Sequence, residues 1–314
     1  GQRVAAAMLE RGSLPDAENN EVPITRIRIS DIAQPLTAIA DDERIETVIG
    51  DFTAAGAAEE LLGTDTDVII HLAAVVSGQA EANFDLGMRI NLDGTRGLLD
   101  ACRALAKAPR LVFTSSVAAF GGDMPEVLDD RTHLTAQNSY GIQKTICELL
   151  INDYTRKGFI DGRSLRLPTV VVRPGKANAA ASSFASAVIR EPLQGSDYAC
   201  PVKADTSMWL MSPRKVVDAL IHGTVMPASV FAGGFRSVSL PGLTVTIEQM
   251  VDAMRAEAGD EVADRVSFMP DPMIEQIVYG WPTRFATPRA EAMGFTADSD
   301  FRDVVKAFIE DDLQ

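Results

Sequence analysis

Three residue types suited to redox chemistry on an alcohol lie near the middle of the chain. Tyr140 and Lys144 stand four residues apart in QNSYGIQKTICELL, downstream of the strand-like run RLVFTSS, which ends in Ser115 and Ser116. Positions i and i+4 of a helix share one face, so the Lys144 ammonium is expected to lower the pKa of the Tyr140 phenol and let it act as a base. The spacing indicates a site that removes a proton from an alcohol while a hydride leaves the same carbon.

A tyrosine and a lysine at this spacing are also common on ordinary amphipathic helices, so the surrounding elements must decide what the pair means. Strand and helix patterns alternate through the first half of the chain, with strand-like runs at 24–30, 44–50, 67–73, 110–116 and 165–174. This alternation predicts an α/β fold, namely a Rossmann-like doubly wound parallel sheet with helices on its faces.

Two domains are expected. From about Pro174 the chain is richer in Ala, Ser, Pro and Gly, and its helical runs are shorter. Residues 1–174 should form an NAD-binding Rossmann domain and residues 175–314 mainly a smaller substrate lobe, with the segment at about 212–240 returning to the sheet. A sheet of this type opens with a strand and a glycine-rich turn, so we expect roughly ten such residues before Gly1, where a helical run begins.

Composition excludes several classes of protein. No apolar stretch in the 314 residues approaches the roughly 20 residues that span a bilayer, so we expect no membrane partner. The net charge of −15 and the lack of a basic stripe argue against nucleic acid. Cysteines and histidines are scattered singly, which argues against disulfides and metals and favours a reducing cytoplasm; they are Cys102, Cys147, Cys200, His71, His133 and His222.

Residues that end the predicted strands point to a dinucleotide. Asp31 closes the second strand, where a carboxylate can accept hydrogen bonds from both hydroxyls of an adenosine ribose and repel a 2′-phosphate. No Arg or Lys follows within four residues, so NAD is favoured over NADP. The next strand ends in Asp51 and Phe52, and the one after it ends in His71, Leu72, Ala73 and Ala74. The small side chains of Ala73 and Ala74 allow the backbone to approach a dinucleotide closely.

The order of these pieces resembles the extended short-chain dehydrogenase/reductase family. The matching pieces are Asp31, G-D-F at 50–52, H-L-A-A at 71–74, N-L-D-G-T at 91–95, F-T-S-S at 113–116, Y-G-I-Q-K at 140–144 and R-P-G at 173–175. The resemblance covers nearly the whole chain. It implies that Tyr140 is the general base, that Lys144 holds the nicotinamide ribose and that Ser116 orients the substrate oxygen, with Ser115 as runner-up.

The resemblance also assigns cofactor contacts. Asn91 resembles a helix asparagine that supports the strand carrying His71. Pro174 resembles a residue that lies near the nicotinamide amide. Gly1 resembles the last glycine of the family's G-x-x-G-x-x-G turn. The full set of expected NAD contacts is Gly1, Asp31, Asp51, Phe52, Leu72, Ala73, Ala74, Asn91, Ser115, Tyr140, Lys144 and Pro174.

The substrate is expected to be small and without a nucleotide, because a diphosphate calls for several arginines and the second lobe is poor in charge before Arg190. LRLPTVVVRPGKANAAASSFASAVIREPLQG and GWPTRFATPRAEAMGF resemble a branch of the family that oxidises a four-carbon sugar acid at C2. Lys176 or Arg284 would hold its carboxylate, with Arg190 a weaker third. The other expected substrate contacts are Val76, Ser77, Ser116, Tyr140, Ser182 and Ser183.

Alternatives remain open. A nucleotide-sugar 4-epimerase or reductase fits the same scaffold, and a non-catalytic NAD sensor is a further alternative, although such sensors usually lack the Tyr or the Lys. We also expect a homodimer, because the helical runs at about 81–107 and 138–157 resemble the family's dimer-forming pair.

Overall fold

A four-stranded parallel sheet, in the order β11-β7-β6-β5, lies at the centre of the computed structural model, which describes residues 1–16, 18–35, 39, 41–175, 182–231 and 234–313. Its strands are β5 Val68–His71, β6 Arg110–Ser116, β7 Asp161–Leu167 and β11 Ser237–Ser239. They run in parallel, and His71 pairs with Phe113. The predicted α/β class with a parallel sheet is confirmed.

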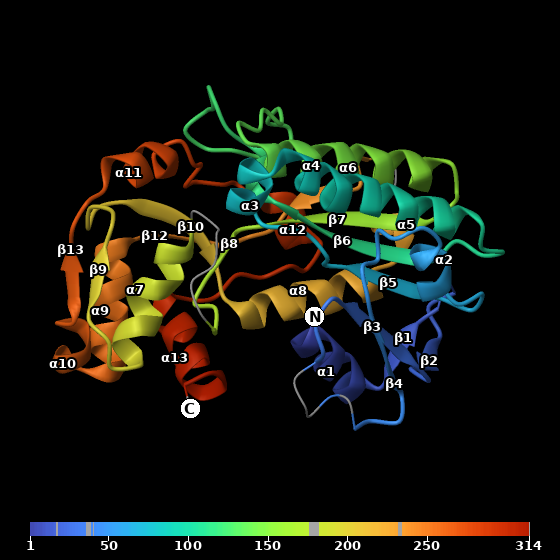
Figure 1. The fold of residues 1–314 in the computed structure, drawn as a ribbon, viewed down its shortest axis with the longest axis horizontal. Helices are drawn as coiled ribbons and strands as arrows, with labels where there is room; N and C mark the ends of the chain where they lie inside the picture. Colours follow the sequence, from blue (N-terminus) through green and yellow to red (C-terminus); the bar gives the residue numbers. More distant parts are fainter. Residues whose placement is uncertain (17, 36–38, 40, 176–181, 232–233, 314) are drawn as a thin grey trace.

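Helices cover both faces of this sheet (Figure 1). One face carries α5 Gly94–Arg103 and α6 Ser139–Arg156, and the other carries α8 Pro213–Val225 and α1 Gln2–Arg11. Successive side chains of β6 point to opposite faces of the sheet and so contribute to two apolar cores. Leu111 and Phe113 pack toward α5 and α6, whereas Val112 packs toward α1 and α8.

Two further parallel strands, β3 Ile27–Asp31 and β4 Ile45–Ile49, pair with each other in register. Within the described part of the chain, no ladder joins this pair to the four-stranded sheet. A short antiparallel hairpin of β1 Ser13–Pro15 and β2 Glu21–Pro23 precedes it, and α2 Ala57–Leu61 follows it.

The helix expected at about 81–107 is confirmed for residues 84–103, but its start and its regularity differ from the expectation. The chain instead forms α3 Ser77–Ala82, α4 Phe84–Gly87, a π-helix at Met88–Asp93 and then α5. Asn83 breaks the run because its backbone leaves the helical region and its side chain accepts a hydrogen bond of 3.0 Å from the Leu86 amide. The expected fifth strand also differs, since β7 begins at Asp161 and ends at Leu167.

The second lobe begins at β8 Thr169–Val170, which follows β7 along the chain but pairs with β10 Ser207–Met211 and not with the central sheet. Its helices enclose a separate apolar core that includes Val188, Met250 and Phe308. The remaining elements are α7 Ser183–Leu193, β9 Tyr198–Cys200, β12 Leu243–Thr246, α9 Ile247–Ala258, α10 Asp260–Ala263, β13 Val266–Phe268, α11 Pro272–Val278, α12 Pro288–Ala292, α13 Phe301–Asp311 and 3-10 turns at Val117–Ala119 and Ala228–Phe231.

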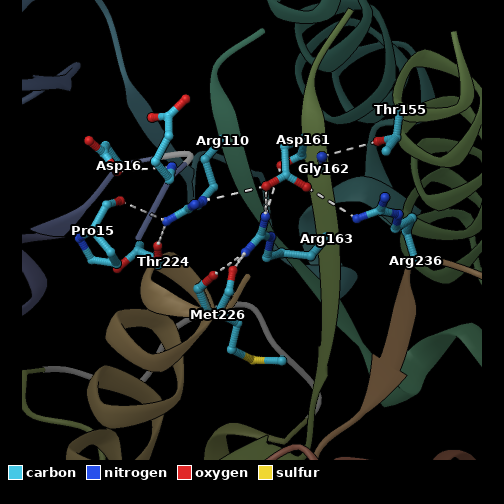
Figure 2. Close-up of polar contacts among 12 residues, drawn as sticks. Pro15, Asp16, Arg110, Thr155, Asp161, Gly162, Arg163, Thr224, Met226 and Arg236 are labelled. Atoms are coloured by element: carbon cyan, nitrogen blue, oxygen red, sulfur yellow. Dashed lines mark hydrogen bonds and ion pairs between the residues drawn. The ribbon is translucent and has the colours of Figure 1, made fainter. Parts of the chain in front are cut away.

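Arginines close the amino ends of β6 and β7 (Figure 2). Asp161 forms ion pairs with Arg110, Arg163 and Arg236. Arg163 also donates to the Gly223 and Met226 carbonyls at the end of α8, at 2.9 and 2.7 Å. These bonds satisfy helix-terminal carbonyls that would otherwise be buried without partners, so the cluster fixes α8 against the sheet. Among the described helices, none is both long enough and apolar enough to cross a bilayer.

Candidate active site

Ser116 and Tyr140 meet at the carboxyl end of β6. Ser116 ends the strand, and its hydroxyl accepts a hydrogen bond of 3.1 Å from the Ala118 amide in the following 3-10 turn. Asn138 caps α6 by accepting from the Gly141 amide at 2.8 Å, which starts the helix beside that turn. The Ser116 hydroxyl acts on the Tyr140 phenol and favours its ionised form, lowering its pKa. The structure therefore brings the predicted hydroxyl and phenol together.

Lys144 lies one turn further along α6 and is buried. Its ammonium donates a hydrogen bond of 2.7 Å to the Thr114 carbonyl and lies 5.5 Å from the centre of the Tyr140 ring and 4.5 Å from that of Phe113. Burial lowers the pKa of Lys144 to about 8, and the nearby Cys147 and Glu148 raise it less.

The phenol of Tyr140 does not have the lowered pKa that the spacing led us to expect. Burial raises the pKa of Tyr140 to about 12, while the Ser116 hydroxyl and the charge of Arg173 act in the opposite direction. The Tyr140 residue is half-buried. Without a ligand the phenol is therefore protonated at neutral pH, and further positive charge beside it is needed to make it a base.

Ser115 points into a different polar cluster. Its hydroxyl donates to Glu148, which is 0% exposed, and Glu148 also receives a bidentate pair of bonds from Arg166, at 2.7 and 3.0 Å. Because this buried group holds the Ser115 hydroxyl, the geometry favours Ser116 as the hydroxyl that faces a substrate.

Asn91 fixes the segment that follows β5. Its side-chain amide accepts a bond of 2.8 Å from the Val75 amide, and donates to the Val75 carbonyl at 3.1 Å and to Gln143 at 2.7 Å. Asn91 lies in the π-helix, which turns its side chain toward this segment. The asparagine thus ties the end of β5 to α6, in keeping with the supporting role that the sequence assigned to it.

His71 is buried at the end of β5, and its Nε2 atom lies 2.9 Å from the Thr95 hydroxyl. Burial lowers the pKa of His71 to about 3, so the ring is neutral at neutral pH. Phe52 packs edge-on against it with ring centres 5.7 Å apart. Phe52 reaches this place because Gly94 has no side chain: a Cβ there would lie 2.7 Å from the Phe52 ring.

Asp31 lies exposed at the end of β3, where its carboxylate accepts a bond of 3.2 Å from the Ala33 amide. Gly1 is the N-cap residue of α1 and lies close enough to Asp31 for an electrostatic interaction. A carboxylate beside a helix amino end fits the ribose and diphosphate of a dinucleotide. Asp51 is instead bound by Thr53 and Arg89, which lower its pKa to about 2.

The predicted substrate contacts are dispersed. Ser77 is the first residue of α3 and Ser182 precedes α7, both half-buried. Lys176 lies outside the described residues. Arg284 is 56% exposed and forms an ion pair with Glu126.

The other residues that the sequence assigned to the site have distinct surroundings. Arg190 is buried against Glu191, Ala73 and Pro174 are exposed, and Leu72, Ala74 and Val76 are half-buried. Arg173, which acts on the Tyr140 phenol, was missed by the sequence reasoning, although R-P-G at 173–175 had marked its position. Across the described residues, no group of three or more His, Cys, Asp or Glu side chains is arranged to hold a metal ion.

Comparison with known proteins places this geometry in a family. Residues 14–220 match the family described as NAD dependent epimerase/dehydratase. The chain is 50% identical to the D-erythronate dehydrogenase of Cupriavidus necator, covering 99% of this chain and 95% of that protein, and 42% identical to the one from Haemophilus influenzae, covering 100% and 96%.

A solved structure resembles the chain equally broadly. It is the nucleoside-diphosphate-sugar epimerase from Agrobacterium tumefaciens, with a TM-score of 0.92 and 42% identity over 100% of this chain and 91% of that one. The resemblance that the ordered motifs indicated is confirmed. The chain belongs to the NAD-dependent epimerase/dehydratase family, within the extended short-chain dehydrogenases/reductases.

Proposed function

We propose that this protein oxidises the C2 hydroxyl of D-erythronate to the ketone, giving 2-dehydro-D-erythronate, with NAD+ as the electron acceptor. The observation that carries the proposal is the identity of 50% and 42% to two D-erythronate dehydrogenases over essentially the whole chain. The meeting of Ser116, Tyr140 and Lys144 at the end of β6 supports the same reaction.

In this proposal the side chains have separate tasks. Ser116 donates a hydrogen bond to the substrate oxygen and orients it toward Tyr140. The Tyr140 phenolate takes the hydroxyl proton, an effect worth roughly 10²- to 10⁴-fold in rate. Lys144, held by the Thr114 carbonyl, keeps a cation close to the phenol and binds the nicotinamide ribose.

NAD+ fits the residues that line the carboxyl ends of the strands. Asp31 would bind the adenosine ribose, and the segment with Ala73 and Ala74 would lie against the dinucleotide with Asn91 holding it from behind. Bound NAD+ supplies the hydride acceptor and a positive ring beside the phenol. Since burial raises the pKa of Tyr140 to about 12, that charge favours the phenolate in the complex.

A nucleotide-sugar epimerase is the second candidate, because the Agrobacterium structure carries that title at 42% identity. Such a substrate presents a diphosphate, which several convergent arginines usually bind. On α7 of the second lobe, Arg190 is already paired with Glu191. This supports a small acid over a nucleotide sugar.

The decisive experiment is a substrate screen that follows NADH fluorescence. Four-carbon sugar acids, D-erythronate among them, are compared with UDP-sugars, and binding of UDP is measured separately. We expect NADH formation with D-erythronate and weak UDP binding. Epimerisation of a UDP-sugar without net NADH would overturn the proposal. In the same assay, Tyr140→Phe should lose turnover and still bind NAD+.

We further propose a homodimer that works in a reducing cytoplasm, with residues 1–174 serving NAD+ and residues 175–314 mainly the substrate. Three large apolar side chains are exposed on two contacting helices, namely Phe84 at 59%, Ile142 at 49% and Leu149 at 55%. They lie on α4 and α6, which supports packing against the same helices of a second copy. The free cysteines, all buried, are consistent with a reducing compartment.

A further inference from the structure

Arg173 is held in place by two buried side chains of α7. Its amide donates to the Ser186 hydroxyl at 3.3 Å, and its carbonyl accepts a bond of 3.0 Å from Arg190. Ser186 and Arg190 are both buried, and Arg190 is itself fixed by Glu191 at 2.7 Å. The backbone at Arg173 is therefore anchored to the second lobe on both sides.

Arg173 follows the carboxyl end of β7, where Leu167 pairs with Ser116, and its charge acts on the Tyr140 phenol. The two groups act on each other electrostatically: Arg173 favours the phenolate of Tyr140, and Tyr140 favours the guanidinium. Burial and the neighbouring Arg190 oppose the charge of Arg173 and lower its pKa. Arg173 is bonded through its backbone to α7 of the second lobe, and its charge reaches the phenol on α6.

No protein carboxylate neutralises this charge. Within the described part of the chain, no Asp or Glu lies at ion-pairing distance from Arg173, and the undescribed positions 17, 36–38, 40, 176–181, 232–233 and 314 contain neither residue type. By contrast, Arg190 is paired with Glu191 and Arg284 with Glu126. A half-buried guanidinium without an anion partner, in a chain with net charge −15, is arranged to receive an anion from outside.

We propose that Arg173 binds the carboxylate of the substrate and so makes the enzyme specific for 2-hydroxy acids. This rests on the proposed function. In a 2-hydroxy acid the carboxylate carbon is bonded directly to the carbon that carries the reacting hydroxyl. A cation next to the Tyr140 phenol can therefore hold the carboxylate while the hydroxyl reaches the phenol. The planar guanidinium can bind both carboxylate oxygens at once, which also fixes the orientation of C2.

The test is a comparison of steady-state kinetics for Arg173→Gln, Arg173→Lys, Arg284→Gln and the surface control Arg26→Gln, whose side chain pairs with Asp65. Each is assayed with D-erythronate and with D-erythronamide, which keeps the hydroxyl and lacks the charge. Arg173→Gln should raise the KM for D-erythronate roughly 10- to 150-fold, as expected for loss of hydrogen bonds to a charged group. The amide reaction and NAD+ affinity should change little.

Arg173→Lys retains the charge and should recover part of the lost affinity, which a purely structural role would not produce. An unchanged KM in Arg173→Gln, an equal loss with both substrates, or a raised KM in Arg284→Gln alone would overturn the inference while leaving the proposed reaction intact. Failure of the wild-type enzyme to oxidise D-erythronate would instead overturn the proposed function. In that case the variants are assayed with other 2-hydroxy acids, and activity only on uncharged or nucleotide-sugar substrates would overturn the role of Arg173 as well.

Discussion

Gly141 of α6 packs directly on the Ala118 carbonyl oxygen, so closely that a Cβ on Gly141 would lie 2.0 Å from that oxygen. The contact joins the start of the helix that carries Tyr140 to the turn that follows Ser116. It explains why a glycine comes directly after Tyr140. The close approach of α6 to this turn thus requires a residue without a side chain at position 141.

Gly141→Ala should therefore push α6 away from the turn and separate Tyr140 from Ser116. We expect a loss of kcat that exceeds any loss of NAD+ affinity, together with a lower Tm. Gly97→Ala is the matched control, because Gly97 lies in α5 with no atom within 4 Å of the added Cβ. That substitution should stabilise the protein by about 0.5–1 kcal/mol in thermal unfolding. Equal kinetic behaviour of the two variants would contradict the steric explanation.

Ser116→Ala should move the pH dependence of the reaction. The Ser116 hydroxyl lowers the pKa of Tyr140, so its removal should delay deprotonation to higher pH. The rising limb of kcat/KM against pH should shift in the alkaline direction, measured with D-erythronate from neutral to alkaline pH. Ser115→Ala, which removes a bond to Glu148, should not shift that limb.

Lys144→Met should stabilise the ligand-free protein at neutral pH. Burial lowers the pKa of Lys144 to about 8 from its ordinary 10.5, so below pH 8 an ammonium is charged in both states and its burial opposes folding. Between pH 8 and 10.5 the unfolded chain binds more protons than the folded protein, so the free energy of unfolding of the wild type rises with increasing pH. The Tm advantage of the variant should therefore be largest below pH 8 and shrink above it. A variant that is less stable at neutral pH would show that the bond to Thr114 and the contact with Phe113 outweigh desolvation.

Glu148→Gln should destabilise the fold strongly. It leaves Arg166 buried without its counter-ion, a change that costs roughly 3–5 kcal/mol in other buried pairs. Urea unfolding should give a lower midpoint. Glu261→Gln breaks an exposed pair with Arg265 and should change stability by less than about 1 kcal/mol. Similar midpoints for the two variants would contradict the importance of burial.

Leu149→Glu should convert the proposed dimer to monomers, since it places a charge on the exposed face of α6. Size-exclusion chromatography with light scattering measures the mass directly. Met273→Glu, on exposed α11, is the control that should leave the mass unchanged. A wild-type monomer at working concentration would remove the basis for the dimer.

Sequence patterns were sufficient where local physics decides the structure. The apolar runs that became β4 and β6, and the i, i+4 spacing of Tyr140 and Lys144, were readable because they depend on nearest neighbours along the chain. The β1–β2 hairpin was missed, because strands of three residues with a proline in each carry no alternating pattern.

Long-range packing determined the rest. The Tyr140 pKa was predicted in the wrong direction for the free chain because burial of the phenol depends on elements far apart in sequence. Arg173 was passed over for the same reason: a cation after a strand looks solvated until α7 folds back over it.

The π-helix at Met88–Asp93 makes the length of this segment as important as its composition. A π turn accommodates one residue more than the regular helix around it, and here that surplus turns the Asn91 amide toward Val75 and Gln143. Deleting a single position anywhere between Asn83 and Gly94 would rewind the segment into an unbroken α-helix and rotate Asn91 out of reach. A point substitution that spares Asn91 and the glycines keeps this spacing, whereas a change in the number of residues would uncouple β5 from α6.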